Sequence, residues 1–174
     1  LRYTPSTRPP AQTAAALIAP VVTALQAALA KIVVGDPQAQ GVRMGPLASL
    51  EQRREVLDRL AELRAEANLV AGDPQVPIPG AGDFGRGAFM SPMLLLCMEP
   101  TRGRAVHEVE AFGPVATVMA YDGVDEAVAL ARRGGGSLVA SIVSADDQLA
   151  ARLVLGLAPY HGRVLVLNRH CAKE

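Results

Sequence analysis

Residues 138–167, LVASIVSADDQLAARLVLGLAPYHGRVLVL, contain the clearest fold signal of this sequence. The segment begins with an apolar run over 138–143 and ends with another over 164–167, and both are short enough for buried strands. Between them, residues 146–157 are rich in Ala and Leu and predict a helix. A strand, a helix and a strand at this spacing favour parallel pairing through a right-handed crossover, and hence an α/β fold.

The same alternation is predicted upstream of this segment. Residues 93–96 and 115–119 are short apolar runs suited to buried strands, and residues 124–132 predict a helix. Residues 72–87 are instead rich in glycine and proline, which predicts an exposed loop. We therefore expect residues 1–174 to form a single domain of three αβα layers, with a mostly parallel and incomplete sheet.

Two further helices are predicted in the first third of the chain. Residues 13–30 are rich in Ala and Leu, and we expect this helix to be kinked at Pro20 or to begin there. Ser49 and Gln52 fit a capping box, so a second helix should begin here and run to about Asn68. Its charged residues are interpreted as a solvated face.

The composition excludes several classes of function. Seventeen basic residues balance seventeen acidic ones, so the chain offers no electrostatic footprint for nucleic acid or an anionic membrane. No apolar run approaches the roughly 20 residues of a membrane helix, and residues 1–10 lack a secretory signal, so we expect a cytoplasmic protein. The missing initiator Met and the abrupt end at Glu174 indicate part of a longer polypeptide.

The cysteines and histidines suggest no metal site and no disulfide framework, because none has ligand spacing. Cys97 ends an apolar run, which is typical of a small buried hydrophobe. Cys171 adjoins His170, but neighbouring side chains in an extended chain point apart, so we interpret both cysteines as non-catalytic free thiols. His107 and His161 are expected at the surface or in turns.

One motif stands out from ordinary α/β sequence: HEVEAFGPV at residues 107–115. It resembles the Glu-x-Phe-Gly-Pro-Val signature of the aldehyde dehydrogenase superfamily. Further blocks follow the order of that family from about Ala15 to Glu174, which implies the carboxy-terminal part of a catalytic domain. They include KIVVGDP at 31–37, MGPL at 44–47, GAFMSPMLL at 87–95 and GRVLVLN at 162–168. Details such as GVRMG at 41–45 and GGGSL at 134–138 resemble most the dehydrogenase half of the bifunctional ring-opening enzymes of phenylacetate degradation.

The resemblance implies roles for three residues and a cofactor, NADP or NAD. It implies that Glu110 accepts hydrogen bonds from the hydroxyls of the nicotinamide ribose, that Phe112 packs beside the nicotinamide, and that Asn168 contacts substrate. A carboxylate suits the first role because it is acceptor-only and forms strong charge-assisted bonds. We expect Glu110 at a cleft beyond the carboxyl ends of the strands. The alternatives are a solvated loop acid for Glu110 and an ordinary core residue for Phe112.

The chemistry of that family needs a Cys thiolate that attacks the aldehyde, an oxyanion site and a Glu base that activates water. In the family these groups precede the matched region. The resemblance therefore implies that no catalytic residue lies in this chain and that the chain is inactive alone. Its implied partners are a small aldehyde and the remainder of its own enzyme, which is expected to be a homo-oligomer when full length.

The resulting hypothesis is a fragment of an NAD(P)-dependent aldehyde dehydrogenase that oxidises an aldehyde to a carboxylic acid. The phenylacetate resemblance implies a coenzyme A-linked semialdehyde as substrate. Two alternatives stay open at this point: a non-catalytic stand-alone domain with a scaffold or partner-binding role, and an acylating dehydrogenase that passes its acyl group to free coenzyme A.

Overall fold

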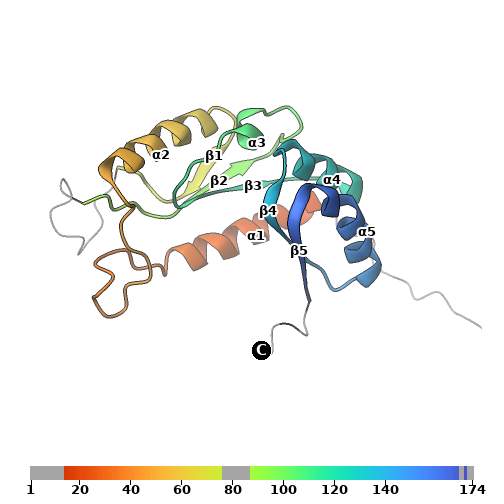
Figure 1. Ribbon diagram of the computed structural model, residues 1–174, viewed down its shortest axis with the longest axis horizontal. Helices are drawn as coiled ribbons and strands as arrows, with labels where there is room; N and C mark the ends of the chain where they lie inside the picture. Colours follow the sequence, from red (N-terminus) through yellow and green to blue (C-terminus); the bar gives the residue numbers. More distant parts are fainter. Residues whose placement is uncertain (1–13, 76–86, 169–170, 172–174) are drawn as a thin grey trace, which may run out of the picture.

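A computed structural model describes residues 14–75, 87–168 and 171 of the protein (Figure 1). Helices and strands alternate along most of this part of the chain. The helices are α1 (Ala14–Leu29), α2 (Leu50–Leu63), α3 (Ala105–Glu108), α4 (Gly123–Arg133), α5 (Asp147–Leu157) and the short 3-10 helix η1 (Ala158–Tyr160). The strands are β1 (Asn68–Ala71), β2 (Met93–Cys97), β3 (Val115–Met119), β4 (Ser137–Val143) and β5 (His161–Leu167).

The described strands form two sheets. In the first, β2 lies between β1 and β3, antiparallel to β1 and parallel to β3. The second consists of β4 and β5 in parallel. Helices α2 and α1 lie on opposite sides of the first sheet, while α4 and α5 pack beside the second (Figure 1). The predicted α/β class and the parallel pairing around a crossover helix are confirmed, with the difference that the strands divide between two sheets.

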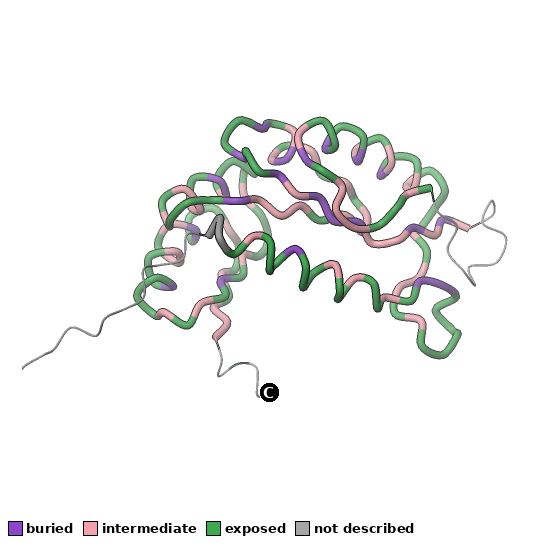
Figure 2. Tube along the Cα trace, turned by 180° about the vertical axis from the view of Figure 1, so that it is seen from behind, coloured by how far each residue is buried: buried purple, intermediate pink, exposed green. Residues whose placement is uncertain are grey.

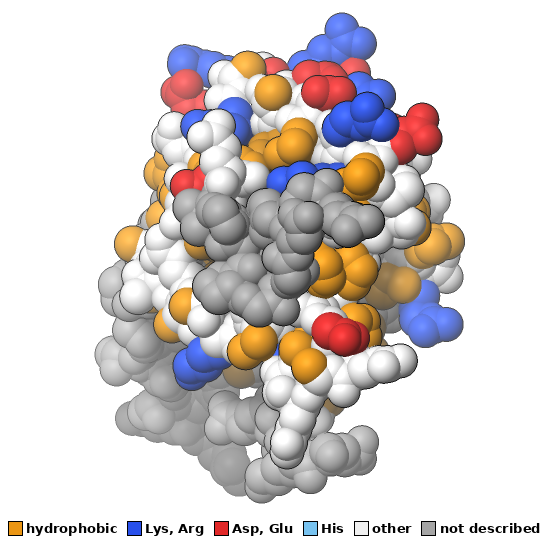
Figure 3. All heavy atoms as spheres, turned by 90° about the vertical axis from the view of Figure 1, so that its left-hand side faces the viewer, with side chains coloured by type: hydrophobic (Ala, Val, Ile, Leu, Met, Phe, Trp, Pro, Cys, Tyr) orange, Lys and Arg blue, Asp and Glu red, His pale blue; other side chains and the backbone are white. Residues whose placement is uncertain are grey.

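Helix α2 begins where its capping box predicts. The Ser49 hydroxyl accepts a hydrogen bond from the Gln52 amide at 3.0 Å, and the Gln52 side chain in turn accepts one from the Ala48 amide at 3.0 Å. The first bond satisfies an amide donor that the first turn of a helix leaves unpaired, and the second fixes the residue before the N-cap. The face of α2 that points away from the first sheet carries exposed charges. These charges lie at the top of Figure 3 and form the predicted solvated face.

The main apolar core lies between α2 and β2. Three residues of α2 are buried at helical spacing and pack with inward-facing residues of β2, and Figure 2 shows these buried positions on the facing sides of the two elements. Burying such side chains contributes roughly 1.5–3 kcal/mol each. The cluster consists of Val56, Leu60, Leu63, Ala67, Met90, Met93, Leu95, Cys97 and Val106.

The predicted end of α2 is wrong. We expected the helix to run to about Asn68, but it ends at Leu63 and the chain turns before β1. Residues 68–71 then pair with β2, where Asn68 lies opposite Leu96. Sequence could not reveal this strand, because four residues are too few for a periodic signal and their partner lies more than 20 positions away.

Helix α1 runs through Pro20 instead of beginning there. Proline lacks an amide hydrogen, so one bond of the helix is missing at this point. The helix is fastened to the first sheet by the Gln26 side chain, whose Nε2 donates to the carbonyl of Val70 at 2.7 Å. Most of its apolar residues are nevertheless exposed, among them Leu17 and Val21, as Figure 2 shows for this helix.

The second half of the described chain follows the prediction closely. Helix α4, strand β4, helix α5 and strand β5 appear at the expected places, and β5 begins three residues earlier than expected. Ile142, Ala150 and Leu157 form a second buried cluster between α5 and its sheet. Most of the predicted loop at 72–87 lies outside the described residues. Within the part of the chain that is described, no helix combines the length and apolarity needed to cross a membrane.

Candidate functional site

Glu110 lies in the connection between α3 and β3. Helix α3 closes when the Val109 amide donates to the carbonyl of Ala105 at 2.9 Å, and Glu110 follows directly. Two tight turns then lead into the strand, since the amide of Gly113 donates to Ala111 O at 2.7 Å and that of Val115 to Gly113 O at 2.8 Å. Glu110 is exposed at this point. The connection therefore presents a carboxylate to solvent just before β3 begins.

Phe112 is 71% exposed, so the alternative reading of this residue as ordinary core is wrong. Its backbone is held from α2, because Nε2 of Gln52 donates to the Phe112 carbonyl at 2.7 Å. Oε1 of the same side chain accepts a hydrogen bond from the Ala48 amide. Gln52 therefore links the start of α2 to the signature segment. The sequence predicts Gln52 only as a capping residue. A bond across 60 positions leaves no signal in a single sequence.

An open hollow of about 600 Å³ lies along this segment. It brings Glu110 and Phe112 together with residues of α2, α3 and β3, and its wall is mixed in polarity. Such a concave surface with a few polar groups is typical of a ligand site. The lining residues are Leu47, Gln52, Leu63, Val106, Val109, Glu110, Ala111, Phe112, Gly113, Val115 and Thr117.

One expectation about this site differs from the structure. Glu110 precedes β3, whose first residue pairs with the first residue of the parallel strand β2, so the expected position beyond the carboxyl ends of the strands is wrong. The reason is local, because the turns at 111–115 hold the signature at the amino end of β3. Asn168 does not join Glu110 in the hollow. It follows β5 in the other sheet, half-buried, and its Oδ1 lies 3.7 Å from Sγ of Cys171.

The two cysteines have different environments. Cys97 is 1% exposed within the main core, and burial raises the pKa of its thiol. This confirms the prediction of a buried structural residue, because a reactive thiol needs an accessible and electropositive setting. Cys171 is exposed. Among the described residues, no group of three His, Cys, Asp or Glu side chains is placed to hold a metal ion.

The two described histidines each bind a backbone carbonyl. His107 Nε2 lies 2.8 Å from Pro100 O, and His161 Nδ1 lies 2.9 Å from Leu157 O. Both side chains are half-buried. His107 thus ties α3 to the turn that precedes it, and His161 ties the start of β5 to the end of α5, which is a structural use.

Comparison with characterised proteins finds relatives over most of the chain. It is 46% identical over 146 residues to the 3,4-dehydroadipyl-CoA semialdehyde dehydrogenase of Aromatoleum evansii, covering 83% of this chain and 28% of that protein. It is 42% identical over 132 residues to Protein MaoC of Klebsiella aerogenes, covering 75% of this chain and 38% of that protein. The chain thus spans less than two fifths of the length of these relatives.

Solved structures show the same arrangement. Betaine aldehyde dehydrogenase from Staphylococcus aureus, in complex with NAD+, matches with a TM-score of 0.74 and 27% identity, over 86% of this chain and 29% of that one. Aldehyde Dehydrogenase C from Pseudomonas syringae, in complex with NAD+ and octanal, matches with a TM-score of 0.73 and 29% identity, over 86% and 30% of the two chains. Residues 14–167 also match the model of a family described as the aldehyde dehydrogenase family.

Proposed function

Because this chain belongs to the aldehyde dehydrogenase family, we propose that it forms part of an NAD(P)-dependent enzyme that oxidises an aldehyde to a carboxylic acid. The proposal of a coenzyme A-linked semialdehyde as substrate is supported by the 46% identity to a protein named for such a substrate. The solved relatives that contain NAD+ support the choice of cofactor class. The partners of this chain are then the aldehyde, the dinucleotide and the rest of its own polypeptide.

One observation carries the cofactor part of this proposal: the exposed carboxylate of Glu110 at the rim of an open hollow. In our proposal it accepts hydrogen bonds from the two hydroxyls of the nicotinamide ribose. An ionised carboxylate offers two oxygens and no donor, which matches two neighbouring hydroxyls, and bonds to an ionised acceptor are the stronger ones. When bound, the dinucleotide supplies the acceptor for the hydride that leaves the substrate.

Phe112 supplies the apolar part of the proposed cofactor site. Its ring is exposed, while its backbone is fixed by Gln52, so the ring can cover the nicotinamide without entering the core of the protein. An exposed aromatic side chain on a fixed backbone loses little entropy when a flat ring packs against it. We propose that Glu110 and Phe112 together orient the nicotinamide, which matters because small misplacements slow hydride transfer strongly.

The nucleophile of the reaction is proposed to come from another part of the parent polypeptide. Cys97 is unsuited because its sulfur is buried and the raised pKa keeps it protonated at neutral pH. Cys171 is exposed and its Sγ lies 3.7 Å from the carboxamide oxygen of Asn168, and in our proposal this thiol is not the nucleophile either. The 174-residue chain alone is therefore expected to be silent in an aldehyde oxidation assay.

Asn168 is proposed to contact the substrate. This proposal is supported by the position of Asn168 just after β5, at the carboxyl end of a parallel pair of strands. Sheets of α/β proteins commonly bind ligands at that end. Its carboxamide can both donate and accept hydrogen bonds, which suits a carbonyl or a hydroxyl group of the substrate.

The test uses the full-length enzyme and the substitution Glu110→Gln. Glutamine keeps the size of the side chain but loses the charge, so the hydride-transfer rate should fall by about tenfold or more in single-turnover assays of cofactor reduction. The matched control is Glu62→Gln, because Glu62 is an exposed acid of α2 that forms a surface ion pair with Arg59. A Glu110→Gln enzyme with the rate and cofactor affinity of this control would refute the proposed role.

A further inference from the structure

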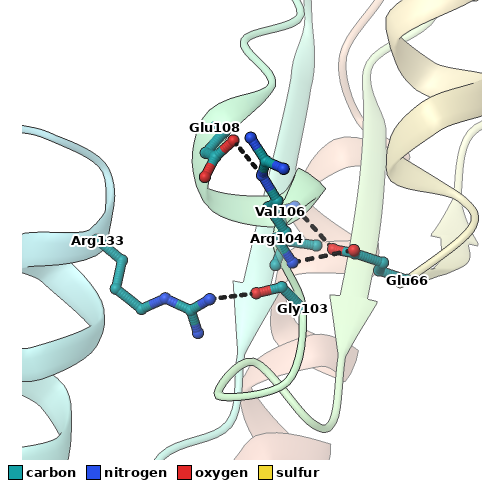
Figure 4. A network of polar contacts seen from close by, with 6 residues as sticks. All are labelled: Glu66, Gly103, Arg104, Val106, Glu108 and Arg133. Carbon is teal, nitrogen blue, oxygen red and sulfur yellow. Dashed lines mark hydrogen bonds and ion pairs between the residues drawn. The ribbon is translucent and has the colours of Figure 1, made fainter.

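The segment between β2 and β3 carries Glu110 but has little core of its own. Among residues 98–114, only Pro100, Gly103 and Val106 are buried. The segment is instead held by two charged side chains that come from other elements, as Figure 4 shows. Glu66 reaches it from the turn between α2 and β1, and Arg133 reaches it from the last residue of α4.

Glu66 binds the amino-terminal end of α3. Its Oε1 accepts a hydrogen bond from the Arg104 amide at 2.9 Å, and its Oε2 accepts one from the Val106 amide at 3.1 Å. These amides belong to the first turn of a helix and have no partner within it. They hold the pKa of the Glu66 carboxyl below its ordinary value, because they stabilise the ionised form. Glu66 therefore acts as a capping residue supplied from a distant part of the chain.

The position of Glu66 also fits Gly103. A Cβ atom on Gly103 would lie 2.8 Å from Oε2 of Glu66 and 2.9 Å from Cγ2 of Val106. Both separations are shorter than an ordinary van der Waals contact. The carboxylate and the backbone at 103–106 are thus in close contact, and any larger residue at 103 would push them apart.

Arg133 binds the other end of the segment. Its Nη1 donates to the carbonyls of Pro100 and Thr101, at 2.8 Å each, and its Nη2 donates to the carbonyl of Gly103. A guanidinium presents several donors in a rigid plane, so one side chain can bind three carbonyls of a turn at once. His107 adds a second bond to the Pro100 carbonyl. The backbone at 100–103 is therefore fixed by bonds that a lysine could not reproduce.

Glu110 follows directly from this fixed unit. The turn at 100–103 is held by Arg133, the start of α3 by Glu66, and the end of α3 by the bond from Val109 to Ala105. On the far side of Glu110, Gln52 holds Phe112. The carboxylate thus lies between two anchored points, and the anchor on its amino-terminal side consists of Glu66 and Arg133.

We propose that Glu66 and Arg133 are positioning residues that act through Glu110 to hold the nicotinamide ribose, an inference that rests on the function proposed above. Neither side chain lines the hollow, so neither touches the cofactor there. Each removes conformational freedom from the backbone that carries Glu110, which lowers the entropic cost of fixing the cofactor.

The experiment is a double-mutant cycle in the full-length enzyme. Glu66→Gln and Arg133→Ala are each made in the wild type and in the Glu110→Gln background. For every variant, the cofactor dissociation constant and the single-turnover rate of hydride transfer are measured, the latter with protiated and deuterated aldehyde. The matched controls are Glu62→Gln, an acid of α2 in an exposed pair with Arg59, and Arg152→Ala, in an exposed pair with Asp125 away from the 98–114 segment.

The expected result is about a tenfold loss in hydride-transfer rate or cofactor affinity for Glu66→Gln and for Arg133→Ala, with both controls unchanged. In the Glu110→Gln background the same substitutions should cost less than about twofold, because interacting residues are not additive. A purely structural role would give the same loss in both backgrounds, and that result would overturn the inference.

The failure of this inference can be told apart from failure of the proposed function. If Glu110→Gln is impaired but Glu66→Gln and Arg133→Ala behave like their controls, the positioning role is wrong and the proposed function stands. If Glu110→Gln itself is unimpaired, the proposed cofactor role fails and the inference with it. Should the first variants not fold, Glu66→Asp and Arg133→Lys enter the same cycle under the same criteria, since the shorter acid cannot span both amides and the ammonium lacks the planar fork.

Discussion

The contact between Gly113 and Val56 can be tested by the substitution Gly113→Ala. Gly113 belongs to the signature segment, next to Phe112, and packs on the buried face of α2. A Cβ atom at this position would lie 2.7 Å from Cγ2 and 3.0 Å from Cγ1 of Val56. Ordinary contacts are 3.4–4 Å, so the added methyl group is too close to both branches of the valine.

The magnitude follows from how little Val56 can move. It is fully buried in the main core, and a β-branched residue in a helix has essentially one side-chain rotamer. Relief must therefore come from a shift of the backbone at 111–115 away from α2. Overpacking of this kind typically costs about 1–3 kcal/mol, so we expect Gly113→Ala to lower the free energy of unfolding by about that amount.

The assay is urea denaturation of the chain, followed by circular dichroism, with Gly134→Ala as the matched control. Gly134 has an ordinary φ of −71° and a Cβ there would meet nothing closer than 3.9 Å. The control should be neutral or stabilising by about 0.4–1 kcal/mol, because alanine restricts the unfolded chain.

A rescue variant completes this test. Val56→Ala removes the two methyl groups that the new Cβ would meet, so Gly113→Ala should cost much less in that background than in the wild type. The reasoning is refuted if Gly113→Ala is as stable as Gly134→Ala, or if its cost is the same whether residue 56 is valine or alanine.

Two further predictions concern single groups. Cys171 should react with a thiol reagent at once and Cys97 only after unfolding in urea, because the first is exposed and the second is buried in the core; modification of both at equal rates in the folded chain would contradict the structure. The pKa of Glu66 is lowered by folding, so its stabilising effect is present above its unfolded pKa, near 4.5, and is lost as the pH falls through the folded value. The difference in urea midpoint between wild type and Glu66→Gln should therefore shrink below about pH 4.5; a difference that stays constant from pH 7 to pH 3 would exclude this effect.

The amino-acid sequence alone predicted the helices and strands whose sequence pattern lies within neighbouring residues. In residues 137–167, two apolar runs flank a helical pattern, and this order is compatible with few other assignments of secondary structure. The segment folds as β4, α5 and β5. The start of α2 is equally local, because Ser49 and Gln52 lie within one helical turn. By contrast β1 and α3 are four residues each and were missed, since such short elements exist through their partners in space.

Only part of the site could be foreseen in the same way. Glu110 and Phe112 were selected because they lie in a motif, and the fold places both at one hollow. Gln52, Glu66 and Arg133 are not in that motif, and the hydrogen bonds by which they hold the segment around Glu110 span at least 30 positions in each case. Their residue types give no warning, because most glutamates and arginines of such a chain are exposed and form only weak surface pairs.

The sequence by itself determined the family, the α/β class, the order of most helices and strands, and the residues of the signature. The reason is that motifs and hydrophobic periodicity are patterns of residues that are close together in the sequence. The tertiary structure decided the rest. It placed the signature at the amino end of β3, left Phe112 exposed, divided the strands between two sheets, and brought Glu66 and Arg133 to the backbone before Glu110. The physical reason is that these features depend on hydrogen bonds and packing between distant segments, whose partners are fixed only when the whole chain has folded.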